Sequence, residues 1–349
     1  MCRLSLKDDK ALPFFAGFCF FLSLIDILVP KPLPFFRLGL ANLAIMLSMD
    51  ILSHRSFFAL LLVKVLGQAM LSGTMFSYIV LFSFLGTISS AFVMYVLNFL
   101  RKKRLISFIG ISMLGAFASN ISQFFLARFV ILGEGAYFIL PPFLLISLIS
   151  SVILGLVANS FYVASLWYES LLTGEIALRG YDEEKPKEKH EKKPQRLIIG
   201  LIMIILFIMI DVPTVKVIIF GVALILCIVD RIKINVLNLV LTYACIIIFN
   251  FFPPCGYVIF KYNFFGMFNI IITKEALFNG IMKATLFEGL LYISRWMLKT
   301  HIELRCGLGS VINKSIFVFQ RLITCKKEIR FSNLIGTLDS VLLSLDRIL

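Results

Sequence analysis

Lys64 and Gln68 stand four residues apart in an apolar stretch of this 349-residue chain. A helix over 57–71 would place both side chains on one face. An ammonium group in the middle of an apolar helix costs roughly 2.5 kcal/mol or more on insertion scales, so it is expected to face a cavity, a counter-charge or an anionic ligand. Two alternatives to a ligand-binding role stay open for Lys64: an internal structural hydrogen bond, and a side chain that extends to the membrane surface.

Three further carboxamides, those of Asn42, Asn120 and Gln123, also lie in apolar stretches. They either line a ligand cavity or bond one helix to its neighbour, because polar groups inside a membrane must find partners. Three prolines in the segment 30–37 predict an extended outer loop, which is either a lid or a rigid connection. The predicted substrate-binding residues are Asn42, Lys64, Gln68, Asn120 and Gln123.

The sequence contains none of the common catalytic arrangements. It has no Walker A motif, no Asp-rich pair for magnesium diphosphate, no Ser/His/Asp or Cys/His set, and no C-x-x-C pair among its seven cysteines. We therefore predict no catalytic residue, no metal, no cofactor and no ATPase site. The small-molecule ligand suggested by one lysine among amides is a weak acid, a phosphate-bearing precursor or a vitamin-like molecule.

The composition requires lipid around the chain. It is 60% hydrophobic and 15% charged, with a mean hydropathy of +0.96, whereas soluble domains are about 45–50% apolar and about a quarter charged. The net charge of +14 lies in short loops and one linker, where it sets membrane orientation, so nucleic acid is not predicted as a partner. The predicted fold is an all-α integral membrane protein with about ten transmembrane helices in two modules.

The first module, residues 1–178, contains six predicted spans: 12–29, 38–52, 57–71, 76–100, 105–125 and 141–167. The second and third are short, so they are either tilted or packed inside the protein. Basic residues at 54–55 and 101–104 favour a cytoplasmic N-terminus and a multi-pass chain in the cell membrane. The charged stretch 179–196 is a cytoplasmic linker, since it cannot bury enough apolar area to fold alone.

The second module, residues 197–349, contains further apolar stretches over 197–210, 215–229, 234–252 and 274–299. From residue 300, charges alternate with apolar residues at helical spacing, which is typical of cytoplasmic amphipathic helices that lie against a membrane or a partner. Arg295 and Arg305 are the predicted partner-binding residues. The alternative is that both arginines only anchor the chain at the membrane surface.

Several strings in residues 12–168 resemble the Gx transporter family, also known as heptaprenyl diphosphate synthase component I. They are Lys31-Pro-Leu-Pro with Leu38-Gly-Leu-Ala-Asn42, Leu71-Ser-Gly-Thr74, Ser83-Phe-Leu-Gly86 with Val93-Met94, and Ile109-Gly-Ile-Ser with Gly115-Ala116, Asn120 and Gln123. The family is similar to the substrate-binding S components of energy-coupling factor importers, which are six-helix membrane proteins. The second module resembles the T component of these importers in its four-span layout and in Glu275-Ala-Leu-Phe-Asn-Gly280.

The resemblance implies a fused transporter subunit that binds a small molecule outside and uses separate ATPase subunits inside, and that is not itself an enzyme. The T-component motif of the Ala-Arg-Gly type is missing from this sequence. The second family name implies an alternative function, that of a membrane accessory subunit associated with polyprenyl diphosphate synthesis.

Overall fold

The computed structural model describes residues 6–28, 39–173, 194–251, 258–264, 268–299 and 307–324, together with 336, 339, 340 and 342. It confirms the predicted helical membrane class. Five helices are long and apolar enough to cross a membrane: His54–Ser72, Tyr78–Lys102, Phe108–Phe138, Leu140–Ala164 and Lys274–Leu298. Four shorter apolar helices accompany them, so the described residues account for a multi-pass protein.

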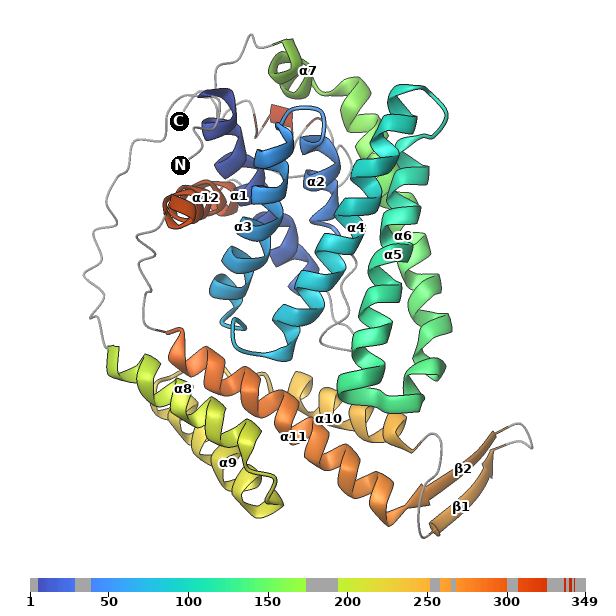
Figure 1. Cartoon of the computed structure of the whole chain (residues 1–349), viewed down its shortest axis with the longest axis vertical. Helices are drawn as coiled ribbons and strands as arrows, with labels where there is room; N and C mark the ends of the chain where they lie inside the picture. Colours follow the sequence, from blue (N-terminus) through green and yellow to red (C-terminus); the bar gives the residue numbers. More distant parts are fainter. Residues whose placement is uncertain are drawn as a thin grey trace.

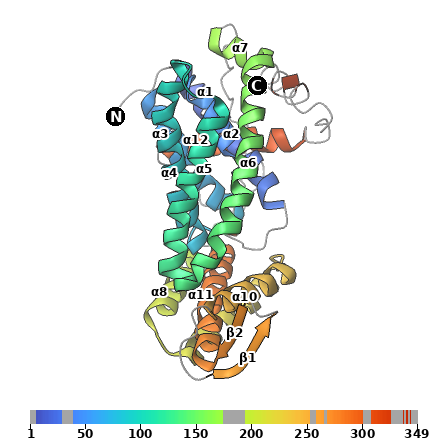
Figure 2. The same ribbon diagram turned by 90° about the vertical axis from the view of Figure 1, so that its right-hand side faces the viewer.

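The first module forms an upright bundle (Figures 1 and 2). Its long helices are α1 (Leu6–Leu28), α3 (His54–Ser72), α4 (Tyr78–Lys102), α5 (Phe108–Ala127) and α6 (Ala136–Ala164). Five of the six predicted spans therefore correspond to helices. The stretch between the fifth and sixth predicted spans is also helical, with a π turn at Arg128–Leu132 and a 3-10 turn at Gly133–Gly135 before α6.

The second predicted span, 38–52, is not a span. Its only helix is α2 (Asn42–Ser48), and every residue of α2 after Asn42 is buried. Seven residues rise only about 10 Å, far less than the ~30 Å of a bilayer core. The apolar character of this stretch therefore reflects burial among α1, α4, α5 and α6 rather than contact with lipid.

The described part of the chain contains one pair of strands, which was not predicted from the sequence. β1 (Val258–Phe264) and β2 (Phe268–Thr273) pair in antiparallel fashion beside the second module. The helices of this module are α8 (Pro194–Met209), α9 (Pro213–Val229), α10 (Val236–Asn250) and α11 (Lys274–Met297). At the N-terminus of α11, the Thr273 hydroxyl accepts a hydrogen bond from the Ala276 amide, so the end of the hairpin also starts the helix.

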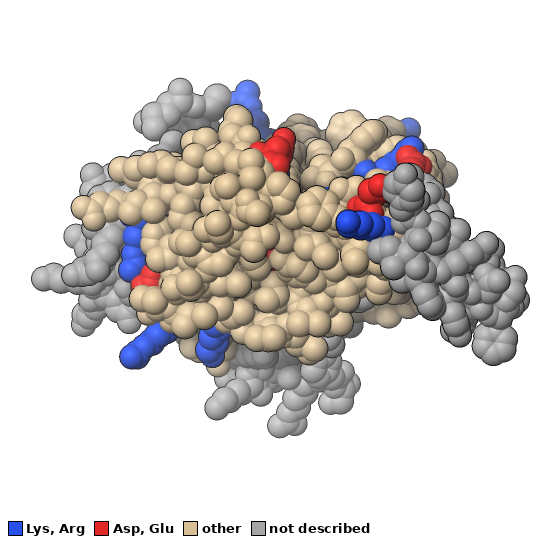
Figure 3. Space-filling model, turned by 90° about the horizontal axis from the view of Figure 1, so that it is seen from below, with Lys and Arg blue, Asp and Glu red and all other residues tan. Residues whose placement is uncertain are grey.

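The second module crosses the lower ends of α3 to α6 obliquely (Figure 1). Its face opposite the bundle is largely uncharged, with Lys, Arg, Asp and Glu toward the margins (Figure 3). Exposed apolar side chains on α8, α9 and α10 include Ile202, Ile225 and Leu237. Such a surface is expected to face lipid, because soluble proteins rarely expose apolar patches of this extent.

Hydrogen bonds join α10 and α11 of the second module to the first module. The Phe76 amide donates to Ser294 Oγ at 3.0 Å, and Asn250 Nδ2 donates to the Ile131 carbonyl at 3.5 Å. Arg295 comes directly after Ser294 in the sequence and packs on Gly73. Gly73 ends α3 in a left-handed turn with a φ of +68°. Arg295 therefore lies at the same end of the bundle as the 72–74 turn. A cytoplasmic N-terminus followed by three predicted spans would put this turn outside, whereas Arg295 is predicted to bind a cytoplasmic partner.

The last described helix, α12 (Gly307–Thr324), belongs to the second module by its place in the sequence, but it packs on α1 and α3 of the first module. A Cβ on Gly17 would lie 2.7 Å from Val318 Cβ, and the rings of Phe20 and Phe319 meet edge to face at 6.3 Å. Asp339, which follows α12 in the sequence, accepts hydrogen bonds from the Leu166 and Trp167 amides at the start of α7 (Leu166–Thr173). The C-terminal part of the chain thus closes against the first module.

Candidate functional site

The helix α3 places Lys64 and Gln68 on one buried face, as their spacing predicted. Lys64 is 4% exposed and Gln68 is 5% exposed. Val63 and Val65 beside them are also buried, so the ammonium group lies in apolar surroundings. This burial contradicts the alternative in which the Lys64 side chain extends to the membrane surface.

Lys64 is the first member of a hydrogen-bonded chain across three helices. Its Nζ donates to Asn42 Oδ1 at 3.2 Å, and Asn42 Nδ2 donates to Ser90 Oγ at 3.4 Å. Asn42 opens α2, Lys64 lies on α3, and Ser90 is fully buried on α4. The structure therefore brings two of the predicted site residues into direct contact through a charge-assisted hydrogen bond.

Ser90 was missed in the sequence analysis, although a signal was present. Ser83, Gly86, Thr87 and Ser90 repeat at helical spacing along α4, and all four are buried. Small and hydroxyl-bearing residues that recur in this way allow close approach of helices within a membrane. A stripe of this kind next to a buried lysine would have identified Ser90 as a candidate.

Gln123 and Asn120 lie on α5 and are 7% and 4% exposed. Gln123 Nε2 donates to Ser119 Oγ at 3.1 Å and packs against the backbone of Gly86, where an added Cβ would be 2.2 Å away. Gln123 Oε1 is buried and meets no donor among the residues described. Gly86 precedes Ser90 by about one turn of α4, so Gln123 contacts that helix roughly 6 Å along its axis from the hydrogen-bonded chain of Lys64, Asn42 and Ser90.

Several predicted elements of the site fall outside the described residues. They are the proline-rich segment 30–37, nearly all of the linker 179–196, and Arg305. Arg295 is described and is partly exposed; its guanidinium lies 5.6 Å from the centre of the Tyr292 ring.

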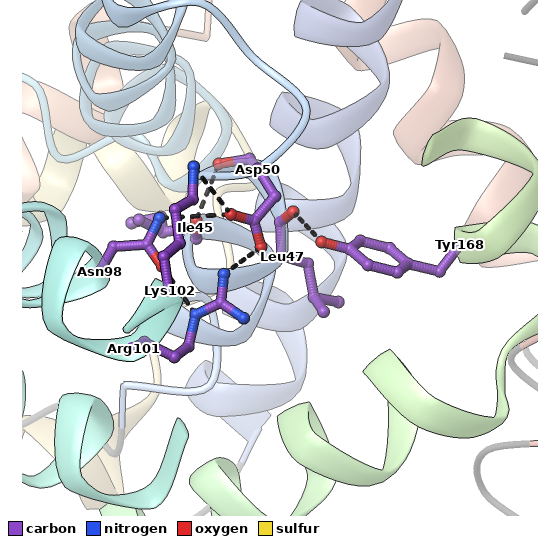
Figure 4. Close-up of polar contacts among 8 residues, drawn as sticks. Ile45, Leu47, Asp50, Asn98, Arg101, Lys102 and Tyr168 are labelled. Carbon is purple, nitrogen blue, oxygen red and sulfur yellow. Dashed lines mark hydrogen bonds and ion pairs between the residues drawn. The ribbon is translucent and has the colours of Figure 1, made fainter. Parts of the chain in front are cut away.

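A second polar cluster lies at the opposite end of α2 (Figure 4). The Asp50 carboxylate pairs with Arg101, accepts a hydrogen bond from Asn98 Nδ2 at 3.3 Å and lies 3.6 Å from Lys102 Nζ. The side chains of Asp50 and Arg101 are only 10% and 12% exposed. The charge pattern marks Arg101 as a loop residue on the cytoplasmic side, but it serves as the partner of a nearly buried carboxylate.

Two contacts connect this cluster to the end of the bundle. The Arg101 guanidinium lies 4.4 Å from the centre of the Phe108 ring, which opens α5. The Tyr168 hydroxyl on α7 donates to the Leu47 carbonyl at 3.0 Å. Burial raises the pKa of Tyr168, and the nearby Asp50 charge adds to this effect, so the hydroxyl keeps its proton as a donor.

The fold and the buried hydrogen-bonded chain define a multi-pass helical membrane protein with a polar site inside its first module. Residues 15–161 match the family model of heptaprenyl diphosphate synthase component I, which confirms the resemblance over most of that module. Residues 192–300 match the model of a domain of unknown function. No curated protein and no solved structure matches the chain.

Proposed function

We propose that the first module binds a small anionic molecule and that the chain is a membrane transporter subunit of the energy-coupling factor type, with a cytoplasmic N-terminus. The observation that carries this proposal is the hydrogen-bonded chain from Lys64 through Asn42 to Ser90. An ammonium group in an apolar interior attracts carboxylate or phosphate oxygens strongly, because water does not screen it. The amide of Asn42 and the hydroxyl of Ser90 would orient such a ligand.

The import function requires separate ATPase subunits, since the sequence has no P-loop. Purification of the full chain from its native membrane in mild detergent is expected to recover an ATPase. Proteoliposomes that contain the complex should take up the ligand only with ATP inside. Isolation without an ATPase, together with uptake that ATP does not change, would refute the importer.

The family description favours a second candidate function, that of an accessory subunit in polyprenyl diphosphate synthesis. Prenyl transfer uses magnesium held by paired carboxylates, and the sequence has no Asp-rich motif of that kind. The importer proposal therefore expects no product when the purified chain is incubated with isopentenyl and farnesyl diphosphates. Product formation by the chain alone would favour the synthase role.

Lys64→Met tests the ligand site directly, because it keeps the length of the side chain and removes its charge. We expect ligand binding to weaken by at least ~1.5 kcal/mol, about tenfold in Kd, which is the lower end for a hydrogen bond to a charged group. The ligand would first be identified by native mass spectrometry of the wild-type protein and then titrated into both proteins.

The matched control is Lys283→Met. Lys283 also donates to an amide, Asn250 Oδ1 at 2.9 Å, but it lies on α11 in the second module. This substitution should leave ligand affinity unchanged. Equal affinity in wild type and a well-folded Lys64→Met protein would leave Lys64 with a purely structural hydrogen bond.

A further inference from the structure

Glu288 lies in the interior of the second module. Glu288 is on α11, which is long and apolar enough to cross a membrane, and it is 2% exposed. Phe287 and Leu290 beside it are buried, and Gly289 packs against Phe207 of α8. A carboxyl group at such a position is unusual, because hydrocarbon surroundings strongly disfavour an ionised side chain.

Hydroxyl groups on α10 and α11 lie near Glu288. Thr242 on α10 is within hydrogen-bonding reach of the carboxyl group and is itself 2% exposed. One turn before Glu288, Thr285 accepts a hydrogen bond from the Tyr243 hydroxyl at 3.0 Å. The Thr285 hydroxyl in turn donates to the Ile281 carbonyl at 2.8 Å. These contacts form a compact polar group within an otherwise apolar packing layer.

The apolar surroundings of Glu288 favour the protonated form of its carboxyl group. Thr242 Oγ1 donates to the Asn238 carbonyl at 2.8 Å, and with its proton there the hydroxyl can accept a hydrogen bond from a protonated Glu288. The same hydroxyl can instead turn and donate to a Glu288 carboxylate. Thr242 is therefore a partner that can bond either protonation state of the carboxyl group.

No positive side chain neutralises Glu288 by direct contact within the described part of the chain. Among the described residues it forms no ion pair, and Arg295, two turns later on α11, instead lies over the Tyr292 ring. Charged or titratable groups on the elements packed around Glu288 include Tyr78 on α4, Cys227 on α9, Tyr243 on α10, and Lys283, Tyr292 and Arg295 on α11.

We propose that Glu288 is a proton-binding site of the second module. The neutral acid can donate a hydrogen bond to Thr242, and release of its proton leaves a carboxylate in apolar surroundings, with Arg295 two turns away on the same helix. Deprotonation therefore reverses the hydrogen bond between Glu288 and Thr242, because a carboxylate can only accept. This site is independent of the ligand site proposed around Lys64.

Dicyclohexylcarbodiimide tests the proposal, because this apolar reagent adds to protonated carboxyl groups and leaves a stable acylurea. The full chain in proteoliposomes would be labelled over about pH 5 to pH 9, a range in which an ordinary glutamate is ionised. We expect peptide mass spectrometry to find the adduct on Glu288, with labelling that declines as pH rises. The exposed Glu275, on the same helix, should stay unlabelled, and Glu288→Gln should remove the adduct.

Infrared spectroscopy provides a second measurement that does not depend on access of the reagent. The wild-type protein should show the carbonyl stretch of a protonated carboxyl group, and Glu288→Gln should lose that band. Absence of both the adduct and the band would overturn the proposal. Protection of Glu288 by sodium ions at constant pH would also overturn it, because the carboxyl and hydroxyl oxygens would then serve a metal cation.

Discussion

Replacement of Arg101 by methionine is expected to lower the free energy of unfolding by about 3 kcal/mol or more. Breaking a buried ion pair typically costs about 3–5 kcal/mol, because one charge remains in the interior without its partner. Here the remaining charge would be the Asp50 carboxylate, whose side chain is only 10% exposed. The change would also remove the contact between the guanidinium and the Phe108 ring. Denaturant titration in detergent micelles would measure the difference.

Lys102→Met provides the matched control. Lys102 contacts the same carboxylate at 3.6 Å, but its side chain is 62% exposed, and exposed pairs contribute only about 0–1 kcal/mol. The double variant Asp50→Asn with Arg101→Met should be more stable than Arg101→Met alone, because no unpaired carboxylate remains. Equal losses for Lys102→Met and Arg101→Met would contradict a buried role for Arg101.

Gly155→Leu is expected to destabilise the first module by about 3 kcal/mol, the upper end for overpacking. On α6, a Cβ at this position would lie 2.5 Å from Ile109 Cα and 3.0 Å from Ile109 N. The backbone of α5 cannot rotate away as a side chain can, so α5 and α6 must separate. The midpoint of thermal unfolding in detergent would report the change.

Gly221→Leu on α9 is the control for this prediction. No described atom lies within 4 Å of a Cβ built at Gly221. Leucine favours helix more than glycine by up to about 1 kcal/mol, so this variant should be as stable as the wild type or slightly more stable. A loss as large as that of Gly155→Leu would mean that leucine is unfavourable in these helices for a reason other than contact with Ile109.

The long helices could be predicted from the sequence because hydropathy alone determines them. α2 could not, because an apolar run of this length fits a short buried helix as well as a tilted span. The hairpin formed by β1 and β2 lies in the less apolar segment before α11, where Phe260-Lys-Tyr-Asn-Phe264 alternates at the period of a strand and could have been recognised. The packing of α12 on α1 depends on residues some 300 positions apart, such as Gly17 and Val318, which no local pattern can pair.

The candidate site could be predicted in part. The rarity of cations in apolar helices identified Lys64, and the structure joins it to Asn42. The sequence could not show that Gln123 belongs to a separate group one turn away, because the relative height of α3 and α5 is set by packing. Glu288 was not singled out, although a carboxylate in an apolar helix follows the same reasoning that selected Lys64.

The return of α12 to α1 has a consequence for synthesis of the protein. α1 is among the first segments to leave the ribosome, whereas Val318, which fills the space beside Gly17, is added about 300 residues later. At typical rates of about 5–20 residues per second, this delay lasts on the order of 15 to 60 s. During that time, the surface of α1 that later packs against α12 lacks this packing partner.

A chain that stops before α12 would therefore carry an incomplete first module, even though residues 15–161, which match the family model, are all present. Quality-control proteases, which act on incompletely packed proteins, would then be expected to remove the first module and not only the shortened second one. In the sequence, α12 comes after helices α8 to α11 of the second module, yet it packs on α1 of the first. Stable accumulation of either half therefore requires that the whole polypeptide be completed.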